Sequence, residues 1–119
     1  IRWVADEAQI DAVTAISGSG PAYFFLFMEA MEEAGITLGL DPETARLLTI
    51  QTALGAAKMA MESDLSPATL REQVTSPGGT TERALTVFDE ADLRALVARA
   101  ATAARDRAIE LSQSLSEQS

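Results

Sequence analysis

Residues 76–81 (Ser-Pro-Gly-Gly-Thr-Thr) form the segment of this sequence that is best suited to chemistry. They precede an apolar-periodic stretch that predicts a helix over residues 81–90. Backbone N–H groups at the start of a helix lie at the positive end of its dipole and attract a small anion such as a carboxylate. The glycines let a ligand approach the backbone closely. The segment therefore predicts an anion site, with Thr80 or Thr81 able to turn its hydroxyl toward the ligand.

The same segment also has a purely structural interpretation. Pro77 fixes one φ angle, the glycines permit a tight turn, and Thr80 or Thr81 can cap the following helix. A connection of this kind binds nothing. Because helix caps are more common than binding sites, local physics alone favours this second interpretation.

Acidic residues near the start of the chain, Asp6, Glu7 and Asp11, are a second candidate for chemistry. They either compensate the dipole of the first predicted helix or pair with a nitrogen of a ligand. Elsewhere, Glu62 and Asp64 lack partner ligands at useful spacing, so no metal site is predicted. The Gly18-Ser19-Gly20 segment fails the dinucleotide-binding pattern, because its third glycine would fall at Tyr23 and no βαβ unit surrounds it. A kink between two helices is the expected role of this segment.

The composition excludes several classes of function. The 119 residues include no cysteine and no histidine, which excludes disulfides, thiolate chemistry and a Ser-His-Asp triad. The net charge is −9 and no basic run exists, so nucleic acid is not an expected partner. No apolar stretch is long enough to cross a bilayer and residues 1–4 show no signal-peptide pattern, so no membrane association and a cytoplasmic location are expected. Since the chain begins with Ile1 rather than Met, we expect it to be a fragment.

Apolar periodicity and turn residues predict an all-α domain of five or six helices, a single domain spanning residues 1–119. The expected helices cover residues 7–16, 21–34, 41 to about 62, 66–74, 81–90 and 92–114. Asp41 and Ser66 are the expected N-caps, each followed by proline, and Gly35 is the expected C-cap. Residues 1–5 are expected to be extended, and the polar tail 114–119 to fray.

Two of the predicted helices are apolar on nearly every face. Residues 23–28 (Tyr-Phe-Phe-Leu-Phe-Met) place large apolar side chains all around one helix, and the helix over residues 41–62 is also apolar well beyond one stripe. A 119-residue monomer cannot easily bury both helices. We therefore predict an interleaved homodimer in preference to a compact monomeric bundle.

Two long motifs resemble one known family. Residues 11–23 (Asp-Ala-Val-Thr-Ala-Ile-Ser-Gly-Ser-Gly-Pro-Ala-Tyr) and residues 74–81 (Val-Thr-Ser-Pro-Gly-Gly-Thr-Thr) are similar to pyrroline-5-carboxylate reductase. Residues 55–58 (Gly-Ala-Ala-Lys) and 70–73 (Leu-Arg-Glu-Gln) lie between them and are similar to that family too. The resemblance covers essentially the whole chain.

The resemblance implies the fold and the activity. Members of the family reduce Δ1-pyrroline-5-carboxylate to L-proline with hydride from NADPH or NADH, the last step of proline biosynthesis. They combine an N-terminal Rossmann domain with a C-terminal helical domain that forms interleaved dimers, and these dimers commonly assemble to decamers. This chain resembles the helical domain alone. We therefore expect it to lack the dinucleotide-binding domain and to be inactive by itself.

The resemblance also assigns roles to residues. Thr81 is the implied catalytic residue, lying near the ring nitrogen of the substrate. Gln73 and Val74 are implied to meet the nicotinamide end of the cofactor. The implied substrate-binding residues are Glu7, Ser76, Gly78, Gly79, Thr80 and Thr81. Glu7 would favour a protonated imine, either from the other subunit or across the interface. The alternative is a non-catalytic helical oligomerisation module, which would tolerate Gly79→Ala without loss of function.

Overall fold

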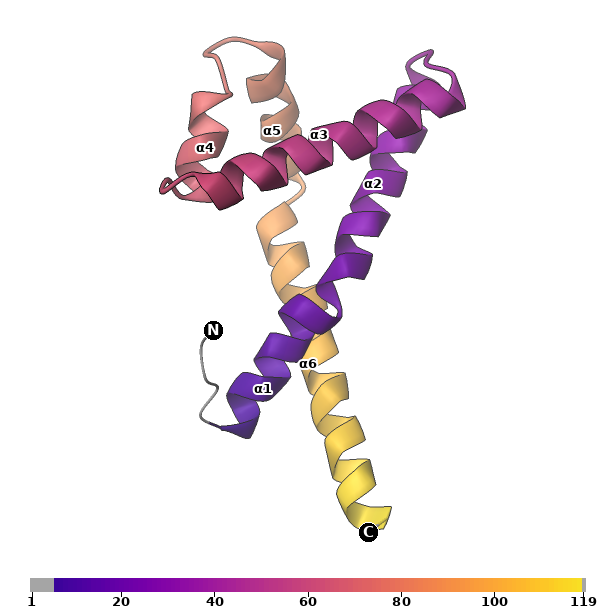
Figure 1. Ribbon diagram of the computed structural model, residues 1–119, viewed down its shortest axis with the longest axis vertical. Helices are drawn as coiled ribbons and strands as arrows, with labels where there is room; N and C mark the ends of the chain where they lie inside the picture. Colours follow the sequence, from indigo (N-terminus) through magenta and orange to yellow (C-terminus); the bar gives the residue numbers. More distant parts are fainter. Residues whose placement is uncertain (1–5, 119) are drawn as a thin grey trace. The chain divides into compact units, whose positions relative to one another are not determined.

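The computed structural model describes residues 6–118, and within this range the chain is helical with no strand, which confirms the predicted all-α fold (Figure 1). Two short segments come first, the helix α1 (Glu7–Val13) and a π turn (Thr14–Gly18). The remaining helices are α2 (Gly20–Thr37), α3 (Pro42–Glu62), α4 (Pro67–Gln73), α5 (Thr80–Glu90) and α6 (Leu93–Gln118). The extended segment that we predicted for residues 1–5 lies outside the described residues.

The chain divides into two units. One unit joins residues 1–24 to residues 91–119, and the other holds residues 25–90. The single domain over 1–119 stays a prediction.

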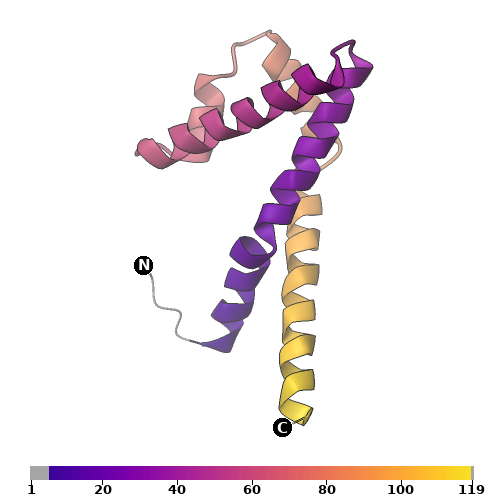
Figure 2. The same cartoon turned by 45° about the vertical axis from the view of Figure 1, so that its right-hand side comes forward.

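The first unit is built around the π turn. The π turn and α1 both pack against α6 (Figures 1 and 2). A small residue lies at this contact, since Ala15 in the π turn is 3% exposed. The predicted interruption of the helix by residues 17–21 is confirmed, and it takes the form of a π turn rather than a simple kink.

The second unit contains a helical hairpin made by the C-terminal part of α2 and by α3. The prediction that Gly35 ends the helix is wrong, because Gly35 lies inside α2. Its missing side chain lets Ala45 of α3 approach, and a Cβ built on Gly35 would lie 3.3 Å from the Ala45 Cβ. The helix ends instead at Thr37, and Gly39, whose φ is +109°, follows as the left-handed residue that stops it.

The end of α2 is a Schellman motif. The Leu40 N–H donates to the Gly35 carbonyl and the Gly39 N–H donates to the Ile36 carbonyl, both at 3.0 Å. Across the hairpin, the Arg46 guanidinium lies 3.1 Å from the Glu32 carboxylate. The Asp41 carboxylate then caps α3 by accepting from the Thr44 N–H at 3.0 Å, as predicted.

The apolar side chains of α2 and α3 remain largely exposed. Phe24, Phe25 and Leu26 are 69%, 62% and 67% exposed, and Leu54 of α3 is 66% exposed. Among the described hydrophobic residues only Ala15 and Ala45 are buried, joined by the polar Thr49. Within residues 6–118 no helix is long and apolar enough to cross a membrane. The exposed apolar side chains of α2 and α3 need another protein surface to cover them.

Two helix ends differ from expectation. The first helix stops at Val13, three residues early, because the π turn begins at Thr14. The last helix runs on to Gln118, so the prediction that residues from 114 onward fray is wrong for the described part of the tail. Its polar side chains lie exposed along a continuing helix.

Candidate functional site

The polar loop singled out in the sequence connects α4 to α5. Helix α4 begins with Ser66, whose hydroxyl accepts from the Thr69 N–H at 3.2 Å, as predicted. It ends at Val74, whose N–H lies 3.3 Å from the carbonyls of both Leu70 and Arg71. The Thr75 hydroxyl donates to the Arg71 carbonyl at 2.6 Å. These short-range bonds hold the start of the loop against the end of α4.

Residues 76–79 form a tight β-turn. The Gly79 N–H donates to the Ser76 carbonyl at 3.0 Å, with Pro77 and Gly78 at the two central positions. Gly78 has φ +72°, which is the conformation that a type II turn requires at this place. A Cβ on Gly79 would lie 3.2 Å from the Ser76 carbonyl oxygen. Both glycines are therefore needed by the turn itself.

The first turn of α5 presents its N–H groups beside this β-turn. The N–H groups of Thr80, Thr81 and Glu82 have no backbone acceptor within the described residues. Neither threonine caps α5, because the helix already begins at Thr80 and its hydroxyl and that of Thr81 bond to no described residue. Both side chains are exposed. Three donors and two free hydroxyls at a helix start are suited to a carboxylate.

Sequence reasoning missed the role of Glu82. Its carboxylate reaches back and accepts from the Gly78 N–H at 3.2 Å, which stabilises the loop and places a negative charge at the start of α5. The available signal was the glutamate at the third position of the helix, which is typical of a capping box. An anion at this site would have to bind beside Glu82.

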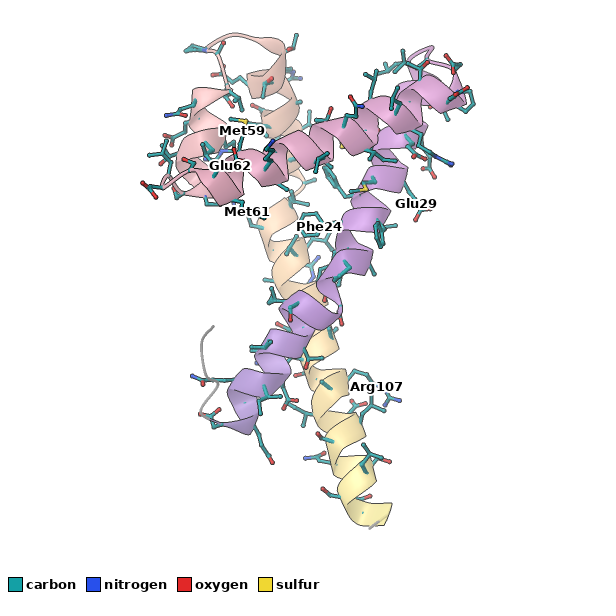
Figure 3. All side chains as sticks on the ribbon, viewed as in Figure 1. Phe24, Glu29, Met59, Met61, Glu62 and Arg107 are labelled. Carbon is teal, nitrogen blue, oxygen red and sulfur yellow. The ribbon has the colours of Figure 1, made fainter. Side chains whose placement is uncertain are left out.

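Gln73 and Val74 lie at the end of α4 and are both exposed. Val74 lines an apolar cleft of about 280 Å³ between α4 and the C-terminal half of α3. Met59 of α3, labelled in Figure 3, lines the same cleft. The other lining residues are Ala56, Ala60, Pro67, Leu70 and Arg71.

A Rossmann-type dinucleotide site places its phosphate-binding N–H groups after a strand, and no strand occurs within residues 6–118. Gln73 and Val74 fit the edge of a nicotinamide ring, with the Gln73 amide as a donor or acceptor and Val74 as an apolar surface. The described residues therefore fit one end of such a cofactor and contain no Rossmann-type phosphate site.

Glu7 lies in the first turn of α1, in the unit that does not contain the loop. Asp6 precedes it and caps α1, since its carboxylate accepts from the Gln9 N–H at 3.0 Å. Glu7 is exposed and forms no ion pair with another described residue. Ser76, Gly78, Gly79, Thr80 and Thr81 are thus brought together in one loop, and Glu7 is not part of that unit. Within residues 6–118 no group of three or more acidic, histidine or cysteine side chains could hold a metal ion.

Comparison with known proteins places these features in context. Residues 7–111 match the family described as pyrroline-5-carboxylate reductase dimerisation. A pyrroline-5-carboxylate reductase from Pseudomonas aeruginosa is 60% identical over 113 residues, which are 95% of this chain and 41% of that protein. One from Arabidopsis thaliana is 47% identical over 110 residues, covering 92% of this chain and 40% of that protein.

Solved structures give the same result. A pyrroline-5-carboxylate reductase from Coxiella burnetii superposes with a TM-score of 0.89 at 58% identity, over 92% of this chain and 40% of that one. The Plasmodium falciparum pyrroline carboxylate reductase, solved with NADP bound, gives a TM-score of 0.83 at 36% identity, over 87% of this chain and 42% of that one. The chain spans about two fifths of the length of the curated relatives that it matches.

Proposed function

The chain belongs to the pyrroline-5-carboxylate reductase family, and we propose that it forms the dimer interface and the substrate-carboxylate site of an enzyme that reduces Δ1-pyrroline-5-carboxylate to L-proline. The observation that carries this proposal is the match over residues 7–111, which includes the loop. The local geometry supports it, because three N–H groups and two hydroxyls at the start of α5 have no partner among residues 6–118.

In this proposal the loop binds and orients the substrate. The N–H groups at the start of α5 hold the substrate carboxylate, together with the Ser76 and Thr80 hydroxyls. The Thr81 hydroxyl lies toward the ring nitrogen and orients it through a hydrogen bond. The rigid turn at Gly78 and Gly79 fixes these donors before substrate arrives, so that less entropy is lost on binding.

Glu7 supplies charge in the same site, from the partner subunit or across the interface. A carboxylate near the imine favours its protonated form, which accepts hydride at carbon to give the neutral amine without a further proton transfer in that step. When bound, NADPH or NADH supplies the hydride. Gln73 and Val74 contact the nicotinamide end, and the remaining cofactor contacts are expected outside residues 6–118.

The interface is the second part of the proposal. The exposed aromatic side chains of α2 and the exposed leucines of α3 form the surface that a second copy covers. Size-exclusion chromatography with light scattering tests this. We expect a dimer or a multiple of it, and a well-folded monomer would contradict the interface.

The site assignment is tested by kinetics of the full-length protein. Loss of a hydrogen bond to a charged substrate costs about 1.5–3 kcal/mol, so Thr81→Ala should lower kcat/KM by about 10- to 150-fold. Glu7→Gln should also lower kcat/KM. Thr86→Ala is the matched control, because this threonine of α5 donates to the Glu82 carbonyl and lies away from the loop. Wild-type kinetics in both test variants would refute the assignment.

A non-catalytic oligomerisation module is the second candidate function. It is favoured by the finding that Gly78 and Gly79 are both accounted for by the turn, without a ligand. Gly79→Ala does not separate the two functions, since the added Cβ would collide with the Ser76 carbonyl in either case. Thr81→Ala does separate them, because it leaves the turn intact.

A further inference from the structure

The π turn at residues 14–18 is held by an unusual set of hydrogen bonds. The Ser19 N–H donates to the Thr14 carbonyl at 2.9 Å, five residues back. In a regular α-helix this N–H would donate to the Ala15 carbonyl, four residues back. The π turn therefore contains one residue more than a continuous α-helix would need.

The side chain of Tyr23 takes the acceptor that the Ser19 N–H does not use. Its hydroxyl donates to the Ala15 carbonyl at 2.8 Å, from a residue eight positions further along the chain. Tyr23 is half-buried, and the Ala15 residue that it contacts is buried against α6. Two other hydroxyls bond nearby, those of Thr14 and Ser17 to the carbonyls of Ile10 and Val13, and both are ordinary bonds to the residue four positions back. Only the Tyr23 bond depends on the π turn.

The extra residue sets the direction in which α1 presents its side chains. If the π turn became a continuous α-helix, everything before it would rotate by about 100° and shift by about 1.5 Å relative to the start of α2. Glu7 lies on α1 and would turn away with it. The position of Glu7 around the helix axis therefore depends on whether the π turn is kept.

We propose that Tyr23 is a positioning residue, whose hydroxyl keeps the π turn and so fixes the rotation of α1 and the placement of Glu7. This proposal rests on the proposed function, because it gives Glu7 a role at the substrate. Tyr23 itself touches neither substrate nor cofactor in this proposal.

The first test is hydrogen exchange, measured by mass spectrometry on peptides covering residues 10–22 of the full-length protein. A change of register must break the bond from Ser19 to Thr14, so Tyr23→Phe should speed exchange there by about two- to tenfold, as expected for one lost hydrogen bond. Ser17→Ala is the matched control, which removes a neighbouring hydroxyl bond that any α-helix tolerates, and it should exchange like the wild type. Exchange that is unchanged in Tyr23→Phe would overturn the proposal.

The second test is a double-mutant cycle on KM for pyrroline-5-carboxylate. Tyr23→Phe should raise KM by about two- to tenfold in the wild-type background and have no further effect in Glu7→Gln. An equal increase in both backgrounds would show that Tyr23 does not act through Glu7 and would overturn its positioning role. If Glu7→Gln alone has wild-type kinetics, the role of Glu7 in the proposed function fails, and the positioning role fails with it, whereas the exchange experiment still reports on the π turn.

Discussion

Residues 17–21 and residues 76–79 have almost the same composition of serine, glycine and proline, and they fold in opposite ways. In the first segment proline follows glycine, and Gly20 and Pro21 begin α2. In the second segment proline precedes glycine, and Pro77 and Gly78 form the centre of a β-turn. Only Gly78 of these four residues has a positive φ.

The order of the two residue types explains the difference. Proline lacks an N–H and has a fixed φ, which suits the first turn of a helix, where that N–H has no partner. Pro42 and Pro67 likewise begin α3 and α4. Pro77 is followed by a glycine with φ +72°, which ends any helical path and closes a turn. The first segment thus continues into a helix, and the second closes a turn that depends on a left-handed backbone conformation.

The largest effect is expected from crowding the buried π turn, which overlaps the start of the first segment. Ala15 is buried where the π turn meets α6, so Ala15→Leu should lower the free energy of unfolding by about 1–3 kcal/mol. Urea unfolding at fixed protein concentration measures this, because association also contributes to stability. Ala12→Leu is the control, since Ala12 is exposed on α1 and should change little. Equal effects at both positions would contradict the comparison.

Replacing one glycine by alanine in each segment should affect the stability of the protein differently. Gly78→Ala forces a side chain into a left-handed conformation and should destabilise the protein by about 1–2 kcal/mol. Gly20→Ala should be neutral or slightly stabilising, because nothing lies within 4 Å of the new Cβ. Thermal unfolding of the two variants side by side gives the answer. A loss of stability in Gly20→Ala as large as in Gly78→Ala would remove the distinction.

A helix that begins with proline should also need the capping residue before that proline for its stability. Ser66→Ala removes the cap of α4 ahead of Pro67 and should lower stability by about 1 kcal/mol. Ser112→Ala serves as control, since Ser112 lies exposed within α6. Unfolding in denaturant compares the two. If both serines are equally dispensable, proline alone is sufficient to start the helix.

The smallest effect concerns pH at the cap of α3. Hydrogen bonds from the Thr44 hydroxyl, and then from its N–H, lower the pKa of the Asp41 carboxyl. A lowered pKa in the folded state adds stability above the unfolded value of about 4, and this contribution is lost as the pH falls through the folded value. Asp41→Asn keeps a capping side chain without the charge. Its melting temperature should be slightly lower than that of the wild type at pH 7, and this difference should shrink as the pH falls through the lowered pKa of Asp41. A difference that does not change with pH would contradict this.

Much of this fold can be predicted from local signals. The caps at Asp41 and Ser66, the prolines after them and the interruption near Gly18 mark helix boundaries by short-range chemistry. Gly35 was misjudged because its role is tertiary, namely to admit Ala45 from a neighbouring helix. A residue of this kind looks like a helix end until its packing partner is known.

The sequence was enough to identify the loop of the candidate site, but not the hydrogen bonds within it. The motif at residues 76–81 identified the segment, but the role of Glu82 and the absence of a threonine cap depend on where α5 begins, and single-sequence reasoning places helix ends only to within a few residues. The bond from Tyr23 to Ala15 was missed because it exists only when an extra residue enters the helix. Hydrophobic periodicity averages over such a local defect.

The division of the chain has a consequence for the order in which it folds. The unit of residues 25–90 is continuous, so its hairpin and loop can form from neighbouring segments as soon as these are synthesised. The other unit joins the first 24 residues to those from Ala91 onward, and its closure must wait for α6 and overcome the entropy of a long intervening loop. The π turn is therefore expected to reach its final packing after the unit of residues 25–90, because it stays uncovered until α6 has been synthesised.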